Sequence, residues 1–329
     1  MLRTSAGLWP RSRAARDPSP LHDAQPMNEI ARKLGNGLET LRHIAVKLAT
    51  LTLGRVYVSR PAIELRRWLD GRTPPYRFSG RAALVAHVYY PELTGEIITC
   101  FLTLPDDSGL ILTCPPDRAA RVTEAAHSAL RVAGADDRTL CIVTVENRGR
   151  DIAPFLHVLN SGMLRDYDAV LKLHTKRSPH LRDGDIRRKL LYTALAGTPR
   201  RTSAVLKMFE SPTTGLVGWR MAWRSSSFFW MKNTARVKQL CHALHCAVPV
   251  QPSFFEGSMF WLRPSALKRL TELGLETGDF EAEAGQTDGT LHHAIERIFP
   301  LIAASNGFST QDIRGRILIG AAPSESALQ

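Results

Sequence analysis

Residues 82–90 read AALVAHVYY, and three similar apolar stretches follow along the chain: SGLILTC (108–114), TLCIVTV (139–145) and YDAVLKL (167–173). Each is short and rich in aliphatic side chains, as expected of a buried strand. Helical patterns separate them over 91–104, 117–132 and 152–164. Strands that alternate with helices of this length form βαβ units. The sequence therefore predicts an α/β fold with a mostly parallel sheet flanked by helices.

The overall composition is that of a globular protein, with 44% hydrophobic and 22% charged residues among 329. It excludes collagen-like, coiled-coil and wholly disordered chains. The net charge is +12, and the first 80 residues hold 14 Lys and Arg against 6 Asp and Glu. A charge excess confined to one arm, without a zinc-finger, RNP or basic-zipper pattern, is weak support for nucleic-acid binding. We therefore expect no nucleic-acid partner.

Three regions are expected along the chain: a disordered basic leader over 1–27, an amphipathic helix and connector over 28–80, and the α/β domain over 81–320. Apolar side chains recur at helical spacing in the second region, at Ile30, Leu34, Leu38, Leu41, Ala45 and Leu48. Arg and Lys occupy the other side of this helix. A basic amphipathic helix binds an anionic membrane surface or packs on its own domain, and both interpretations of residues 28–54 stay open.

No stretch of the sequence is apolar enough to cross a membrane as a helix, a role that requires about 20 consecutive apolar residues. The five cysteines lack CxxC spacing, which favours reduced thiols in a reducing compartment. Cys241, His242, His245 and Cys246 form two i,i+4 pairs if they are helical. Because these pairs point about 100° apart, the four side chains do not converge on a tetrahedral metal ion. We expect no metal there.

Polar side chains follow the predicted strands, at the edge where ligands of parallel sheets bind. Lysine, arginine and imidazole groups predominate among them, which indicates an anionic ligand such as a phosphate or diphosphate. The alternative is that strand ends are exposed in any case, and that Arg148 pairs with Asp151. The candidate donor-binding residues are His87, Tyr89, Asn147, Arg148, Asp151, Lys172, His174 and Lys176.

Five segments match one family in order and spacing: HVYYPEL (87–93), ENRGRDIAPFL (146–156), YDAVLKLHTKRS (167–178), FFEGSMFWLRPSAL (254–267) and EAGQTDGTLHHAIER (283–297). Over about residues 80–300 the chain resembles the rhamnan synthesis protein F family. Members of that family resemble glycosyltransferases that build bacterial rhamnose polysaccharides and lipopolysaccharide side chains. The resemblance implies a nucleotide-sugar donor and a growing, lipid-linked glycan as acceptor.

The order of elements also resembles the GT-A fold of nucleotide-sugar glycosyltransferases, in which an Asn-x-Gly segment precedes the strand that carries an Asp-x-Asp metal motif. Asn147-Arg148-Gly149 fits the first position, but His174-Thr175-Lys176 stands where Asp-x-Asp is expected. The sequence therefore indicates no firm cofactor: a divalent metal stays an open alternative, but no Asp-x-Asp motif stands at the expected place. Cationic side chains can stabilise the departing diphosphate instead, which predicts metal-independent or weakly metal-dependent transfer.

Inverting glycosyl transfer needs a base that accepts the proton of the acceptor hydroxyl. The GT-A resemblance puts this carboxylate before the final helix, which makes Asp288 the first candidate and Glu283 the second. Asp288 is also placed to cap the helix that follows it, as Asp often does. Glu256 and Trp261 are candidates for acceptor binding, through hydroxyl groups and a sugar face respectively.

The resemblance thus implies a glycosyltransferase that moves rhamnose from a deoxythymidine-diphosphate donor. It would act in the cytoplasm, peripherally on the inner face of the membrane. The alternative is a non-catalytic saccharide- or nucleotide-binding partner of a polysaccharide assembly complex, since no Asp-x-Asp motif is present.

Overall fold

The structure is a computed structural model that describes residues 52–70, 76–175 and 184–321, together with positions 37, 41, 44, 45 and 48. Its centre is an eight-stranded sheet with the order β10-β9-β5-β8-β4-β1-β2-β3. The strands are β1 Ala82–His87, β2 Gly109–Cys114, β3 Leu140–Thr144, β4 Ala169–His174, β5 Thr214–Gly218, β8 Phe260–Leu262, β9 Ser309–Asp312 and β10 Ile317–Ile319. A separate two-stranded sheet pairs β6 Trp223–Ser225 with β7 Ser253–Phe255.

Strand directions explain where the ligand edge of the sheet lies. β1 pairs in parallel with β2 and β4, β2 with β3, and β5 with β9. β8 runs antiparallel to both β4 and β5, and β10 runs antiparallel to β9. Lys172 near the end of β4 pairs with Phe260 at the start of β8. The residues just before β8 therefore lie at the carboxyl ends of β1 and β4.

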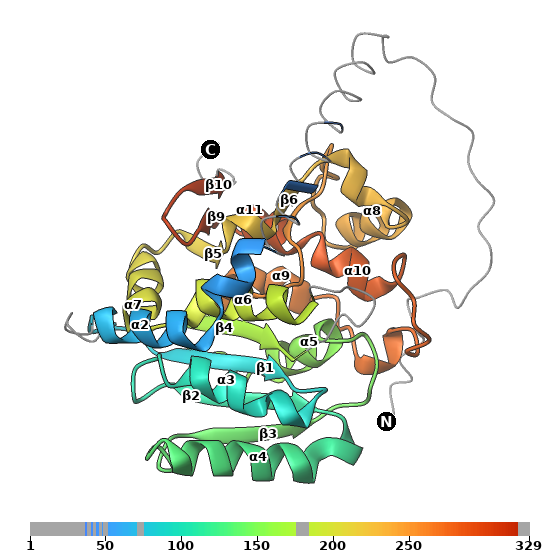
Figure 1. Cartoon of the computed structure of the whole chain (residues 1–329). Coiled ribbons are helices and arrows are strands. Elements are labelled where there is room, and N and C mark those ends of the chain that lie inside the picture. The colour runs from blue at the N-terminus through green and yellow to red at the C-terminus, as the bar shows by residue number, and fades with distance from the viewer. Residues whose placement is uncertain are drawn as a thin grey trace, which may run out of the picture.

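The expected α/β class, a mostly parallel sheet flanked by helices, is confirmed. The arrangement is consistent with a GT-A-like fold, and Figure 1 shows the sheet with helices around it. The helices are α2 Arg60–Asp70, α3 Thr94–Phe101, α4 Ala119–Val132, α5 Ile152–Asn160, α6 Gly184–Ala196, α7 Pro199–Met208, α8 Thr234–Ala243, α9 Lys268–Thr271, α10 Leu291–Glu296 and α11 Phe299–Ser305. Short 3-10 turns occur at Pro91–Leu93, Pro116–Arg118, Arg220–Ala222, Ser227–Trp230, Pro264–Leu267 and Thr277–Asp279.

Two apolar cores cover the two faces of the sheet, because successive strand residues point to opposite sides. Ala83 and Val85 of β1 belong to the core that α5, α8, α10 and α11 close. Leu84 and Ala86 of the same strand belong to the core that α3, α4, α6 and α7 close. β1 is thus buried on both faces, as expected of a central parallel strand.

The N-terminal region differs in part from the expectation. Most of the predicted leader and of the predicted helix 28–54 lies outside the described residues, although the five described positions before residue 50 are helical. The segment after residue 54, expected to be a connector, contains α2 instead, which packs against α7. The sequence did not predict this helix, because its arginine-rich composition indicated a connector. Within the described residues, no helix combines the length and the apolar character that crossing a membrane requires.

Candidate functional site

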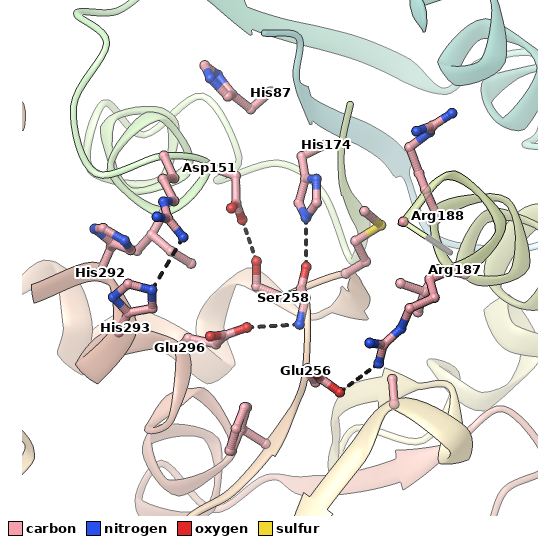
Figure 2. Close-up of a pocket in the computed structure, with 18 of the residues that line it drawn as sticks. His87, Asp151, His174, Arg187, Arg188, Glu256, Ser258, His292, His293 and Glu296 are labelled. Carbon is pink, nitrogen blue, oxygen red and sulfur yellow. Dashed lines mark hydrogen bonds and ion pairs between the residues drawn. The ribbon is translucent and has the colours of Figure 1, made fainter. Parts of the chain in front are cut away.

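A cavity of about 750 Å³ opens at the carboxyl edge of β1 and β4. It lies within the range of about 300–1,000 Å³ typical of small-molecule sites. The ends of both strands, the beginnings of α5 and α6, the turn before β8, and residues 283–297 line it. Figure 2 shows side chains from these elements facing one another. This is the edge at which the sequence predicted a ligand.

The loop after β1 is fastened to the end of β4. The backbone amides of Tyr89 and Tyr90 donate to Thr175 Oγ1 over 3.0 and 3.1 Å. The guanidinium of Arg118 lies over the Tyr89 ring, 3.7 Å from its centroid, and donates to the Tyr89 carbonyl. Tyr89 thus lines the cavity in a fixed orientation, at the position predicted for donor binding.

His87 ends β1 and is a neutral imidazole at physiological pH. Its pKa is lowered to about 4, chiefly by burial and also by nearby His174, Lys172 and Arg118, while Asp151 opposes the shift. Its Nδ1 is 3.1 Å from Thr113 Oγ1 on the neighbouring strand. A neutral ring in this place offers a hydrogen bond to a ligand rather than a positive charge.

Lys172 does not occupy the position that the sequence suggested. Its side chain is 1% exposed, and Nζ donates to Asp151 Oδ2 over 2.7 Å, to the Ser258 carbonyl over 2.9 Å and to Ser258 Oγ over 3.1 Å. Ser258 Oγ also donates to Asp151. All three ammonium hydrogens are therefore used inside the protein, and the prediction that Lys172 grips a phosphate is wrong. Asp151 pairs with Lys172 rather than with Arg148.

The turn Glu256-Gly257-Ser258 is held from both sides of the cavity. His174 Nε2 donates to the Gly257 carbonyl over 2.8 Å, and the Gly257 amide donates to Glu296 over 2.9 Å, as Figure 2 shows. Gly257 and Ser258 have φ angles of 87° and 49°. Such angles are unfavourable for a serine, so the contacts with Lys172 and Asp151 stabilise a strained turn.

Glu256 reaches the cavity from this turn. Its carboxylate accepts from Arg187 of α6 over 3.0 Å and from the buried Arg224 of β6. Trp261, the second predicted acceptor residue, is 0% exposed, and its indole donates to the Leu195 carbonyl over 3.0 Å. Because Trp261 belongs to the core behind the sheet, the prediction that it stacks on a sugar is wrong.

The two predicted catalytic carboxylates have different surroundings. Asp288 accepts from the Lys232 amide over 2.8 Å and from Asn233 Nδ2 over 2.6 Å, and it pairs with Arg297 over 3.2 Å. Burial acts to raise its pKa, but the hydrogen bonds and Arg297 outweigh this, so the pKa lies below the usual value. A carboxylate so fully engaged is a weak proton acceptor, which argues against Asp288 as the base.

Glu283 is the less constrained of the two. It accepts from the Arg150 backbone amide over 3.1 Å, and its other oxygen lies 3.7 Å from Arg150 Nε. It lines the cavity. The same guanidinium lies 3.3 Å from His293 Nε2. Since arginine only donates, His293 Nε2 accepts, which leaves its Nδ1 proton for Thr290 Oγ1, 2.6 Å away.

In the segment after β3, Arg150 lines the cavity in place of the predicted Arg148. Asn147 lines the cavity as expected, but Arg148 does not: it donates to the Phe280 carbonyl and pairs with Glu146. Arg150 takes its place. Gly149, with φ 61°, makes this possible, because a side chain there would lie 2.5 Å from Phe280 and 2.7 Å from Ala153.

Lys176 lies outside the described residues, within 176–183, and its predicted donor contact stays a prediction. Among the residues that the structure places, no three His, Cys, Asp or Glu side chains gather as metal ligands. The five cysteines are free thiols, and Cys241 is buried in the core. The sequence reasoning missed Arg150, Arg187, Glu296 and Arg297, which the fold alone brings together from distant segments.

Fold and cavity together define an α/β domain with a cavity where parallel strands end. The model of the family described as rhamnan synthesis protein F matches residues 43–308, and the chain belongs to this family, as the resemblance implied. Two relatives from strains of Xanthomonas campestris pathovar campestris, both described as uncharacterized protein WxcX, are 34% identical over 248 residues. The match covers 75% of this chain and 34% of theirs, so the chain spans about a third of their length. The family connects the chain with polysaccharide synthesis.

Proposed function

We propose that this chain is a glycosyltransferase domain that transfers a sugar, rhamnose on the evidence of the family description, from a nucleoside diphosphate to a cell-surface glycan. The observation that carries the proposal is the cavity of about 750 Å³ at the carboxyl edge of β1 and β4. α/β folds bind nucleotides at this edge. The volume suits a nucleotide sugar together with the end of an acceptor.

The polar groups of the cavity suit the parts of such a donor. Tyr89 and Asn147 lie beside the end of β1 and the segment after β3, where a nucleoside would be flanked by an aromatic ring and an amide. Arg150 and Arg187 supply planar guanidinium groups for phosphate oxygens. Both now pair with carboxylates, Glu283 and Glu256, and a diphosphate would compete for the same donors.

For the proton transfer, Glu283 is the better candidate. The acceptor hydroxyl oxygen would bond to the anomeric carbon as the bond from that carbon to the diphosphate oxygen breaks. The hydroxyl proton would pass to the Glu283 carboxylate, and the electron pair of the broken bond would leave with the diphosphate. Inversion at the anomeric carbon follows from this single displacement. Asp288 would instead hold the 283–290 loop against the start of α8.

The test is release of nucleoside diphosphate from a panel of nucleotide sugars, including deoxythymidine diphosphate-rhamnose, by the purified chain with glycan acceptors. Glu283→Gln should lower turnover by about 100-fold or more while donor binding is kept, because general base catalysis contributes about that much. Glu124→Gln on the exposed face of α4 is the matched control. No released diphosphate with any donor and acceptor would refute the proposal.

A second candidate, a non-catalytic nucleotide- or saccharide-binding module, is favoured by one observation: Glu256, Glu283 and Asp288 all accept hydrogen bonds or pair with arginines. Binding of a donor without turnover, unchanged by Glu283→Gln, would support this candidate.

A further inference from the structure

Helix α2 turns its three largest apolar side chains after Ile63 outward, whereas Ile63 itself is half-buried. Leu65, Trp68 and Leu69 are 57%, 58% and 47% exposed, and their spacing puts them on one side of the helix. Arg66 and Asp70 are less exposed and line a cavity against the body of the protein. A helix that covers a globular domain normally has the opposite arrangement. This inversion indicates a surface that meets something less polar than water.

Further exposed apolar side chains precede α2 in the sequence. Leu53 and Val56 are exposed by about 70%, and Tyr57 by 43%. Among the helical positions described earlier in the chain, Leu41 and Leu48 are both more than half exposed. Isolated apolar residues on a surface need no explanation, but Leu65, Trp68 and Leu69 lie together on one side of a single helix, which marks an interaction site.

A basic cavity lies beside this apolar surface. It has a volume of about 350 Å³, between α2, the end of α6 and the beginning of α7. Arg66, Arg200 and Arg201 line it, with Asp70 as the acidic residue of the lining. Arg200 pairs weakly with Asp70 over 3.9 Å, and its side chain is largely exposed. The lining therefore keeps two positive charges in excess.

Local structure holds the arginines in place. Arg66 donates to the Tyr57 carbonyl over 2.7 Å, with its guanidinium 4.0 Å from the centroid of the Tyr57 ring. Thr198 caps α7 by accepting from the Arg201 amide over 3.3 Å. Arg200 and Arg201 thus lie in the first turn of α7, where the helix dipole adds to their positive charge. Cations are unfavourable at that end of a helix unless an anion compensates them.

We propose that α2 and the basic cavity beside it form a docking surface for an anionic phospholipid membrane. Leu65, Trp68 and Leu69 enter the interface between headgroups and acyl chains, and the arginines bind headgroup phosphates. Apolar and basic groups side by side are the combination that such helices use. Glu64, exposed at the edge of the apolar side, limits how deeply the helix enters.

A second copy of the chain fits this surface less well than a membrane. A two-fold dimer through α2 would bring the same patch of each copy together. It would then oppose two clusters of three arginines with one aspartate each, which repel one another. A lipid surface supplies the negative charge that both the cavity and the start of α7 lack.

The test is co-sedimentation of the full chain with vesicles of phosphatidylcholine alone, or of phosphatidylcholine with phosphatidylglycerol. We expect binding to the anionic vesicles that falls with added salt. Arg200→Ala with Arg201→Ala should weaken it about 25-fold, on the order of fivefold for each arginine near the surface. Leu65→Ser with Leu69→Ser should weaken it about tenfold or more, because buried apolar area is lost. Arg121→Ala with Arg131→Ala, on the exposed side of α4, is the matched control and should bind as the wild type does.

Three outcomes would overturn the proposal. One is a wild-type chain that stays in the supernatant with anionic vesicles. Another is equal binding by the wild type and by both sets of variants. The third is a dimer in analytical ultracentrifugation that Leu65→Ser with Leu69→Ser dissociates, which would assign the surface to a second copy. Thermal unfolding of each variant shows that the fold is kept, and none of these readouts depends on glycosyl transfer.

Discussion

The buried contact between Lys172 and Asp151 gives the sharpest prediction about stability. Their side chains are 1% and 9% exposed, and the nitrogen and oxygen are 2.7 Å apart. Lys172→Met keeps the length of the side chain and most of its apolar packing against Phe155 and Phe260. It also leaves Asp151 buried without its cation and removes the donor to the Ser258 carbonyl. Breaking a buried pair in this way costs about 3–5 kcal/mol.

The assay is urea unfolding followed by circular dichroism, with the free energy of unfolding taken from the midpoint at constant slope. For a domain of this size the loss corresponds to a fall in Tm of roughly 10 °C. Lys189→Met, on the exposed side of α6, is the control and should change stability by less than about 0.5 kcal/mol.

A double-mutant cycle separates the pair from the packing. The double variant Lys172→Met with Asp151→Asn should lose less free energy of unfolding than the two single variants together. The reason is that the double variant has no unpaired charge at this buried position. The reasoning is wrong if Lys172→Met costs less than about 1 kcal/mol, or if the two changes are additive. In either case the ion pair would contribute little to the stability of the turn Glu256-Gly257-Ser258.

Three further predictions concern the same edge of the sheet. Because the pKa of His87 is lowered to about 4 in the fold, the unfolded chain binds the proton first as the pH falls below 6.5. Stability should therefore drop by about 3 kcal/mol between neutral pH and pH 4, and His87→Gln should flatten this dependence in urea titrations across that range. Gly149→Ala should lower the free energy of unfolding by about 2–3 kcal/mol more than Gly134→Ala does. Both glycines have positive φ angles, but only Gly149 has neighbours that an added side chain would contact. Equal melting temperatures of the two variants would contradict this. Asp288→Ala should lower the free energy of unfolding by about 3 kcal/mol, because the buried Arg297 keeps only the longer contact of 3.9 Å with Glu296. An unchanged unfolding midpoint would show that the pair of Asp288 and Arg297 is not formed.

The α/β class could be predicted from the sequence because its signal is local. Each parallel strand is a short run of aliphatic residues between helical patterns, and β1 and β2 are buried on both faces as such runs require. The three-residue strand β8 carries too little pattern to show that it enters the sheet antiparallel between β4 and β5. α2 was not predicted because the segment Arg60–Asp70 holds three arginines and was interpreted as a connector.

The site could be predicted in position but not in its pairings. His87, Tyr89 and Asn147 do line the cavity, because the carboxyl ends of parallel strands meet at one edge. Lys172 and Asp151 were each selected, but their contact joins β4 to the residue before α5, and no local pattern reveals that they neutralise each other.

The central claim, that the cavity at the end of β1 and β4 binds a nucleoside diphosphate, is tested most directly by calorimetric titration. The account predicts one molecule of deoxythymidine diphosphate bound per chain, and affinity lowered about tenfold or more by Arg187→Ala, since a charge-assisted hydrogen bond contributes about 1.5–3 kcal/mol. Arg121→Ala should leave the affinity unchanged. No binding to the wild type, or equal affinities of the wild type and Arg187→Ala, would contradict it.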